Sequence, residues 1–274
     1  MARLYIGLPQ WQHNAWSSIG LRDFADYSHY FNCVEGNTTF YALPKQETVQ
    51  RWHDMTHDNF RFCFKFPSDI SHKTALRNCN ANLQAFYHCL EPLHQRIGQL
   101  WLQLPATFGP DELQRMWQFF DALPKTFTYG VEVRHPAFFA KGEAERLLNK
   151  GLHQRGINRV ILDSRAVHYS LPNNAAVRDT QQKKPTLPVH ALLTANQPLV
   201  RFIGGDVLAD NLRWFTVWQQ KLVLWQEQHQ PYLFIHTPDN GDSPQQAQKI
   251  WQQLRQVIPD LPASPDWPQQ DALF

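Results

Sequence analysis

Eight short apolar runs alternate along this chain with longer segments of helical periodicity, and this alternation limits the possible folds. The runs are rich in β-branched and aromatic residues, and many end at Gly, Pro or His, as strands that enter functional loops often do. They cover residues 4–9, 33–40, 61–66, 97–105, 127–135, 159–164, 199–204 and 232–237. Eight strand and helix units of this kind predict an α/β protein, a (β/α)8 barrel of the TIM type.

Apolar residues recur at intervals of three and four between these runs, which is typical of helices that pack one face on a core. The stripe of Leu113, Met116 and Phe120 is one example. The last helix has a clear expected start, because Ser243 suits an N-cap and Pro244 suits the first helical position. The helices are therefore expected to cover the outside of the barrel.

Two segments depart from the alternation. Residues 166–197 join the sixth and seventh strands, are polar and contain several prolines, so they predict an irregular excursion without a clear helix over one face. Residues 259–274 form a Pro-rich tail that is expected to be extended and to follow the surface or fray. No internal repeat or linker divides residues 1–274, which are predicted to form a single domain.

Composition argues against several classes of protein. Hydrophobic residues make up 43% of the chain, and the net charge of +2 gives no strong field to attract nucleic acid or an anionic membrane. No apolar run approaches the roughly 20 residues of a membrane span. The first predicted strand begins too early for a signal peptide. The cysteines lack CxxC spacing and are expected to be reduced thiols, which predicts a cytoplasmic protein.

Charged side chains near the carboxyl ends of the predicted strands are the main functional signal. They carry three negative and three positive charges: Glu35, Lys65, Glu132, Arg134, Asp163 and Arg201. Charges are almost never fully buried unless they are paired or coordinate a ligand. Residues two apart share a face of a strand, so Asn37 is expected to point the same way as Glu35. With Gln103 on the fourth strand, six strands are expected to offer polar groups to one pocket at the barrel mouth.

Several short motifs occur in a characteristic order through nearly the whole chain. They are Gly7 with Trp11 and Trp16, Val34-Glu35 with Asn37-Thr38-Thr39-Phe40-Tyr41, Phe62-Cys63-Phe64-Lys65, Leu102-Gln103-Leu104-Pro105 and Val131-Glu132-Val133-Arg134-His135-Pro136. In this order they resemble the YecE-like family of bacterial proteins, domain of unknown function 72. The resemblance implies a TIM-type barrel and brings no established reaction, substrate or cofactor. The chain departs from the family pattern at Ile203, where many members carry a His, and around Asn240, where many carry paired Asn residues.

The predicted pocket favours an enzyme, a hydrolase or isomerase that acts on a small anionic or sugar-like molecule. Balanced acids and bases shift each other's pKa, which suits them to proton transfer. The candidate catalytic residues are Glu35, Glu132, Asp163 and His72. The candidate substrate-binding residues are Asn37, Lys65, Gln103, Arg134, Arg201, Trp11, Tyr41 and Asn240. Two further histidines at strand ends, His135 and His236, either point into the mouth or cap their turns.

Other interpretations remain alongside this one. The arginines could clamp the carboxylates in a purely structural network. The barrel could be a non-catalytic module that binds a small ligand, or one associated with nucleic acid, although the near-neutral charge disfavours nucleic acid. A divalent metal could bind Glu35, Glu132 and Asp163 with a nearby His, but no metal-binding spacing supports it. No cofactor is predicted, since Walker and GxGxxG motifs are lacking. The absence of a GxSxG motif disfavours a hydrolase with a nucleophilic Ser at such a turn, and no oligomeric state is predicted.

Overall fold

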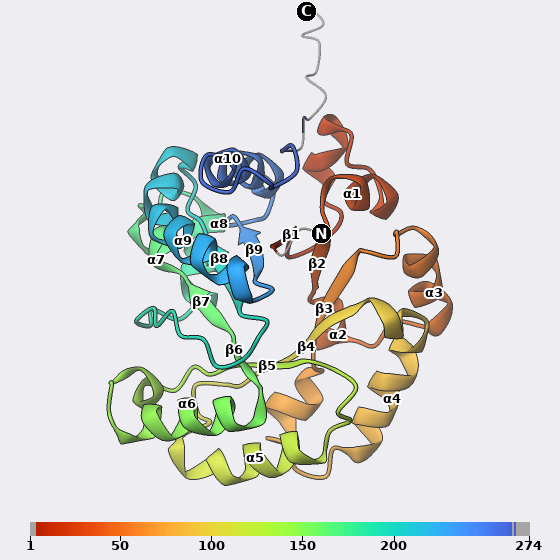
Figure 1. Ribbon diagram of the computed structural model, residues 1–274, viewed down its shortest axis with the longest axis vertical. Coiled ribbons are helices and arrows are strands. Elements are labelled where there is room, and N and C mark those ends of the chain that lie inside the picture. The colour runs from red at the N-terminus through yellow and green to blue at the C-terminus, as the bar shows by residue number, and fades with distance from the viewer. Residues whose placement is uncertain (1–3, 265, 267–274) are drawn as a thin grey trace, which may run out of the picture.

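The α/β barrel predicted from the sequence is present in a computed structural model that describes residues 4–264 and 266 (Figure 1). Within these residues, parallel strands pair in the order β6-β5-β4-β3-β2-β1-β9-β8-β7. The strands are β1 (Tyr5–Leu8), β2 (Cys33–Gly36), β3 (Arg61–Lys65), β4 (Ile97–Gln103), β5 (Tyr129–Glu132), β6 (Asn158–Arg159), β7 (Ile161–Asp163), β8 (Leu199–Ile203) and β9 (Tyr232–His236).

The strand numbering reaches nine because the sixth predicted strand is divided at Val160. β6 pairs with β5, whereas β7 pairs with β8, so the two pieces join the ends of the sheet. The amide of Val160 itself donates to the carbonyl of Val131 at 2.9 Å. The described strands therefore occupy eight positions around the barrel, and the predicted fold class is confirmed with this one difference.

Helices form a ring outside the strands (Figure 1). They are α1 (Phe24–Tyr30), α2 (Thr38–Tyr41), α3 (Gln46–Asp54), α4 (Asn80–Leu90), α5 (Leu113–Ala122), α6 (Glu143–Arg155), α7 (Arg165–Tyr169), α8 (Ala175–Lys183), α9 (Leu208–Gln228) and α10 (Ser243–Arg255). Short helical turns are η1 (Asn14–Ile19), η2 (Asp69–Lys73), η3 (Glu91–Arg96), η4 (Pro110–Glu112) and η5 (Pro136–Phe139). α10 begins at Ser243, one residue earlier than predicted, so Asp242 is the N-cap. Among the described helices, none combines the length and apolarity needed to cross a membrane.

Side chains alternate between two cores along each strand. Outward residues such as Phe62 and Leu100 belong to the large cluster beneath the helices. Inward residues Cys63, Trp101 and Phe234 belong to a small separate cluster that fills the barrel. This inner apolar layer stops two residues before β3, β4 and β9 end, so the last inward position of each strand is left for a polar side chain.

The second strand is shorter than predicted. β2 ends at Gly36, and Asn37 is the N-cap residue of α2 instead of a strand residue. The hydroxyl of Thr39 donates to the carbonyl of Lys65 at 2.6 Å, which attaches the start of α2 to the end of β3. A tertiary contact thus overrides the β-branched pattern of residues 33–40.

The excursion over residues 166–197 was expected to lack helices, and this expectation is wrong. It contains most of α7 and all of α8. The side chain of Asn174 caps α8 by accepting from the amide of Val177 at 2.9 Å. The prolines lie outside these helices, because Pro172 precedes the cap and Pro185 follows the end of α8.

The Pro-rich tail is described only in part. Leu261 is buried, and the carbonyl of Pro262 accepts from the indole of Trp251 at 2.9 Å, so the beginning of the tail packs on α10. Residues 265 and 267–274, on which the rest of the prediction falls, lie outside the described residues.

Candidate functional site

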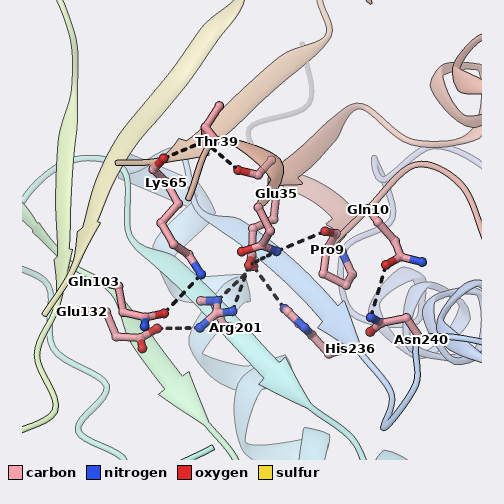
Figure 2. A network of polar contacts seen from close by, with 12 residues as sticks. Pro9, Gln10, Glu35, Thr39, Lys65, Gln103, Glu132, Arg201, His236 and Asn240 are labelled. Carbon is pink, nitrogen blue, oxygen red and sulfur yellow. Dashed lines mark hydrogen bonds and ion pairs between the residues drawn. The ribbon is translucent and has the colours of Figure 1, made fainter. Parts of the chain in front are cut away.

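Six strands each place one buried polar side chain at the mouth of the barrel (Figure 2). These side chains are Glu35 on β2, Lys65 on β3, Gln103 on β4, Glu132 on β5, Arg201 on β8 and His236 on β9. Five of them follow an inward apolar residue by two positions, as with Trp101 before Gln103, and Glu132 follows Gly130, so the period of the strand aims them into the barrel.

Arg201 joins the two carboxylates of this layer. Its Nε and Nη2 donate to Glu35 Oε2 and Oε1 at 3.0 and 2.9 Å, a bidentate pair. Its Nη1 donates to Glu132 Oε2 at 2.6 Å. The guanidinium is buried and also lies 4.9 Å from the centre of the Trp101 ring. Arg201 is therefore the shared cation of the network.

The remaining carboxylate contacts leave no oxygen without a donor. Asn37 Nδ2 donates to Glu35 Oε1 at 2.7 Å, and His236 Nε2 lies 3.1 Å from Glu35 Oε2. Arg134 Nη2 pairs with Glu132 Oε1 at 2.6 Å. Because a carboxylate only accepts, the proton of His236 lies on Nε2.

Electrostatics keep both carboxylates ionised. Burial alone raises the pKa of a carboxyl group, but Arg201 and His236 outweigh it and hold the pKa of Glu35 well below its usual value. Burial also raises the pKa of Glu132, but the charges of Arg134 and Arg201 outweigh this effect, so the pKa of Glu132 is lowered to about 2. Burial lowers the pKa of His236 to about 4, so the imidazole is neutral near pH 7.

Lys65 is a buried amine with unusual neighbours. Its Nζ donates to Gln103 Oε1 at 3.1 Å and lies 4.9 and 4.7 Å from the ring centres of Phe40 and Trp101. No ion pair to a carboxylate is found for it in the described part of the chain. Burial, together with the charge of Arg201, lowers the pKa of Lys65 well below its usual value.

A cavity of about 480 Å³ lies over this layer. Its described lining includes Lys65, Arg134, Lys183, Lys184 and Arg201 as the charged residues, while Glu35 and Glu132 lie buried beneath. The uncharged lining is Pro9, Gln10, Asn37, Phe40, Tyr41, Gln103, His236 and Asn240. The surface that a ligand would meet is thus cationic.

Two amines that line the cavity, Lys65 and Lys184, have no carboxylate partner within the described residues. Lys183 is exposed and pairs with Asp179 at 2.7 Å, whereas no ion pair is found for Lys184 among residues 4–264 and 266. Burial and the charge of Arg201 lower the pKa of Lys184 to about 8. The positive charges of Arg134 and Arg201 are matched by the two buried carboxylates.

A smaller hollow of about 280 Å³ adjoins the cavity, with which it shares Pro9, Gln10, Asn37 and Tyr41. Trp11 lines this hollow and not the larger cavity, and its ring stacks on that of Phe24 with the ring centres 4.8 Å apart. Tyr41 is 82% exposed. The predicted aromatic residues therefore lie at the edge of the site and not on its charged floor.

Asp163 does not reach the pocket, contrary to the prediction. Its carboxylate accepts from the indole of Trp218 on α9 and from Arg165, each at 2.7 Å. Val160 belongs to the inner cluster and Ile161 to the outer one, so the period of two turns Asp163 outward. Asp163 fastens a helix to the barrel and is absent from the cavity lining.

The other predicted residues are divided between the cavity and its surroundings. Asn240 lines the cavity, with Nδ2 at 3.5 Å from Gln10 Oε1. His72 is exposed on η2, where Nδ1 lies 2.8 Å from the hydroxyl of Ser71, and it is not part of the lining. His135 caps η5 by accepting from the amide of Ala137.

Sequence reasoning missed Lys184 and Gln10. The available signal for Lys184 was the Lys183-Lys184-Pro185 run, a pair of cations where α8 must stop before a proline. The metal alternative required Asp163 beside Glu35 and Glu132. Within the described residues, no group of three His, Cys, Asp or Glu side chains is placed to hold an ion.

Comparisons with known proteins agree on one group of relatives. The family model described as "Protein of unknown function DUF72" matches residues 5–271. The UPF0759 protein YecE of Escherichia coli (strain K12) is 57% identical over 271 residues, which cover 99% of this chain and 100% of that protein. The corresponding protein of Escherichia coli O157:H7 is 56% identical with the same coverage.

Solved structures with the same fold come from two other bacteria. A DUF72 family protein from Enterococcus faecalis V583 has a TM-score of 0.69 and 19% identity, covering 96% of this chain and 100% of that one. A DUF72 family protein from Thermotoga maritima MSB8 has a TM-score of 0.66 and 16% identity, covering 92% and 99%. At these identities the likeness supports the barrel fold, and none of the names states a reaction or a ligand.

Proposed function

Since this chain belongs to the DUF72 family, whose description states no reaction, we propose its function from the pocket: it binds a small anionic molecule at the barrel mouth and acts on it as an enzyme. The carboxyl ends of the strands are where barrel enzymes place their active sites. The cavity there has room for a small molecule.

The amines of Lys65 and Lys184, which have no carboxylate partner within the described residues, are the observation that supports this proposal most strongly. A partly buried cation without a carboxylate partner, such as Lys184, has lost part of its solvation. A bound carboxylate, phosphate or sulfonate would compensate Lys184 for this loss and would accept a hydrogen bond from the amine of Lys65. Arg134 would contribute further, because the guanidinium has five N–H donors and only some of them contact Glu132.

The adjoining hollow suggests the rest of the ligand. Trp11 and Tyr41 offer aromatic surface beside the polar edges of Gln10 and Asn37, an arrangement that suits the ring of a sugar-like molecule. A ligand with an anionic group beside Lys184 and a ring against Tyr41 would fill both spaces.

The contacts of Glu35 and Glu132 favour a holding role in this enzyme over the acid and base roles suggested by the sequence. Each of their oxygens accepts from a guanidinium, and their low pKa values make them weak bases. Proton transfer would then fall to the amines of Lys65 and Lys184, which suits isomerisation beside a carbonyl better than hydrolysis. The same saturated carboxylates also favour the second candidate, a module that captures an anion without turnover.

Sulfate binding tests the proposal, because the charge of sulfate is constant over the accessible pH range. Isothermal titration is expected to show one site in the wild type. Lys184→Met is expected to weaken binding about tenfold, as removal of one charge-assisted hydrogen bond does. The matched control is Lys221→Met, which removes an exposed charge on α9 and should leave the affinity unchanged. Equal affinities in all three proteins, or no binding to the wild type, would refute the proposal.

The affinity for sulfate is also expected to depend on pH. The protonated fraction of Lys184 falls as pH rises through its pKa of about 8, so sulfate should bind more weakly one pH unit above this value than one unit below. Lys184→Met should flatten the profile over the same range. A wild-type profile as flat as that of the variant would show that Lys184 does not contribute to the site.

A further inference from the structure

We propose that Lys65 is a nucleophile that forms a Schiff base with a carbonyl group of the ligand, which makes anionic aldehydes and ketones the substrate class. This inference rests on the proposed function, since the anionic group would bring the carbonyl to the amine. Lys65 is the last residue of β3 and lines the cavity with its side chain, as its position beside Gln103 and Arg201 shows (Figure 2).

The surroundings of Lys65 disfavour the ammonium form that cannot attack a carbonyl. The residue is 6% exposed, and no carboxylate pairs with it within the described residues. A second cation, Arg201, lies against the same indole, with its Cζ 4.9 Å and the Lys65 Nζ 4.7 Å from the ring centre of Trp101. Desolvation and a neighbouring cation are the two means by which proteins activate a lysine amine.

Cation–π contacts act in the opposite direction but are the weaker effect. The rings of Phe40 and Trp101 stabilise an ammonium through their π faces. The loss of solvation on burial destabilises a lysine ammonium by more than such ring contacts stabilise it. The balance therefore favours the neutral amine, in agreement with the lowered pKa of Lys65.

Gln103 orients the amine without fixing its charge. Its Oε1 accepts from Nζ at 3.1 Å, and an amide oxygen accepts equally from an amine or an ammonium. A carboxylate at this place would have stabilised the protonated form. The choice of an amide as the hydrogen-bond partner thus keeps the lone pair of Lys65 available.

The step balances with water as its only by-product. The lone pair of Nζ attacks the carbonyl carbon, a C–N bond forms and the π pair of the C=O bond moves to oxygen. The oxygen then leaves as water with the two protons that the amine carried, and a C=N bond remains. Protonation of the imine nitrogen from solvent gives the iminium, whose positive charge the buried carboxylates Glu35 and Glu132 favour and the charge of Arg201 opposes.

Reductive trapping tests this inference. Pyridoxal 5′-phosphate, an aldehyde with a phosphate group, is the probe, and borohydride adds hydride to the iminium carbon to make the adduct permanent. Peptide mapping of the wild type is expected to locate one major adduct on Lys65, formed at least tenfold faster than any adduct on Lys221. Excess sulfate should slow the labelling, and Lys65→Met should abolish the major adduct while Lys221→Met retains it.

The outcomes separate this inference from the proposed function. Wild-type protein that binds sulfate but is labelled on Lys184, or on surface lysines without preference for Lys65, would overturn the Schiff base and leave the anion site intact. Labelling of Lys65 that sulfate does not slow, in a protein that does not bind sulfate, would overturn the anion site. The wild-type map decides the question even if Lys65→Met fails to fold.

Discussion

Replacing Arg201 by Met is expected to destabilise the protein by about 3–5 kcal/mol, the usual cost of removing one partner of a buried ion pair. The guanidinium is shared by two buried carboxylates, and its loss affects them unequally. Glu132 would keep Arg134, but Glu35 would keep only the amide of Asn37 and a neutral His236. An anion would then be left in the barrel without a cationic partner.

Urea unfolding of matched variants measures this effect. Arg155→Met is the control, because Arg155 forms the same bidentate contact with Asp121, at 2.9 and 3.0 Å, on the exposed surface. Exposed pairs contribute about 0–1 kcal/mol, so the control should lose little stability. If the two variants lose equal free energy, the network of Arg201 does not stabilise the barrel.

Acid is expected to remove several kcal/mol of stability from the wild type. A carboxyl group whose pKa is lower in the folded state stabilises the protein above its unfolded pKa, and this contribution is lost as pH falls through the folded pKa. For Glu132 the window runs from the ordinary value of 4.5 down to about 2. This single group contributes about 3 kcal/mol over that window, and Glu35, whose pKa is also lowered, adds to the loss.

The variant Glu132→Gln isolates this contribution. The amide keeps the shape of the side chain but does not titrate, so the variant should be less stable than the wild type at neutral pH and should lose less stability in acid. The measurement is the free energy of unfolding by urea at a series of pH values below neutrality. Parallel pH profiles for wild type and variant would mean that Glu132 is not held ionised by its arginines.

The barrel and its polar mouth could be predicted because both follow from the period of two along a strand. The residues of β3 alternate between the two layers: Phe62 and Phe64 face the helices, whereas Cys63 and Lys65 face the barrel interior. The sequence alone indicates which of these side chains are apolar. The same rule gave the correct face for Arg201. It failed for Asp163, because its face depends on how the strand is divided at Val160, and that division is set by pairing with two different neighbours.

The position of Lys184 depends on contacts between segments far apart in the chain. Its carbonyl lies 3.0 Å from His168 Nε2, and the next carbonyl, of Pro185, accepts from the hydroxyl of Ser164 at 2.8 Å. At the preceding helix, Thr180 donates to the carbonyl of Pro238 at 2.7 Å. These tertiary bonds hold the excursion against the barrel mouth, and neither composition nor periodicity encodes them.

The choice between a clamp and a catalytic role for the carboxylates was also open in the sequence. Side-chain spacing placed Glu35 and Glu132 at one mouth but did not show that Arg201 bonds to both. Those bonds show that the ionised carboxylates hold the guanidinium, and we therefore propose the amines of Lys65 and Lys184, which have no carboxylate partner in the described part of the chain, as the reactive groups. The balance of charge around each residue, and not its type, decides its part in the site.

The location of a bound anion is the observation on which this assignment depends. Crystals of the wild-type protein soaked in selenate would reveal the anion by the anomalous scattering of selenium. The expected result is that the strongest anomalous peak lies in the mouth cavity, within hydrogen-bonding distance of Lys65 and of at least one of Lys184 and Arg134. Anomalous peaks confined to the outer surface, with only water in the cavity, would contradict an anion site at the barrel mouth.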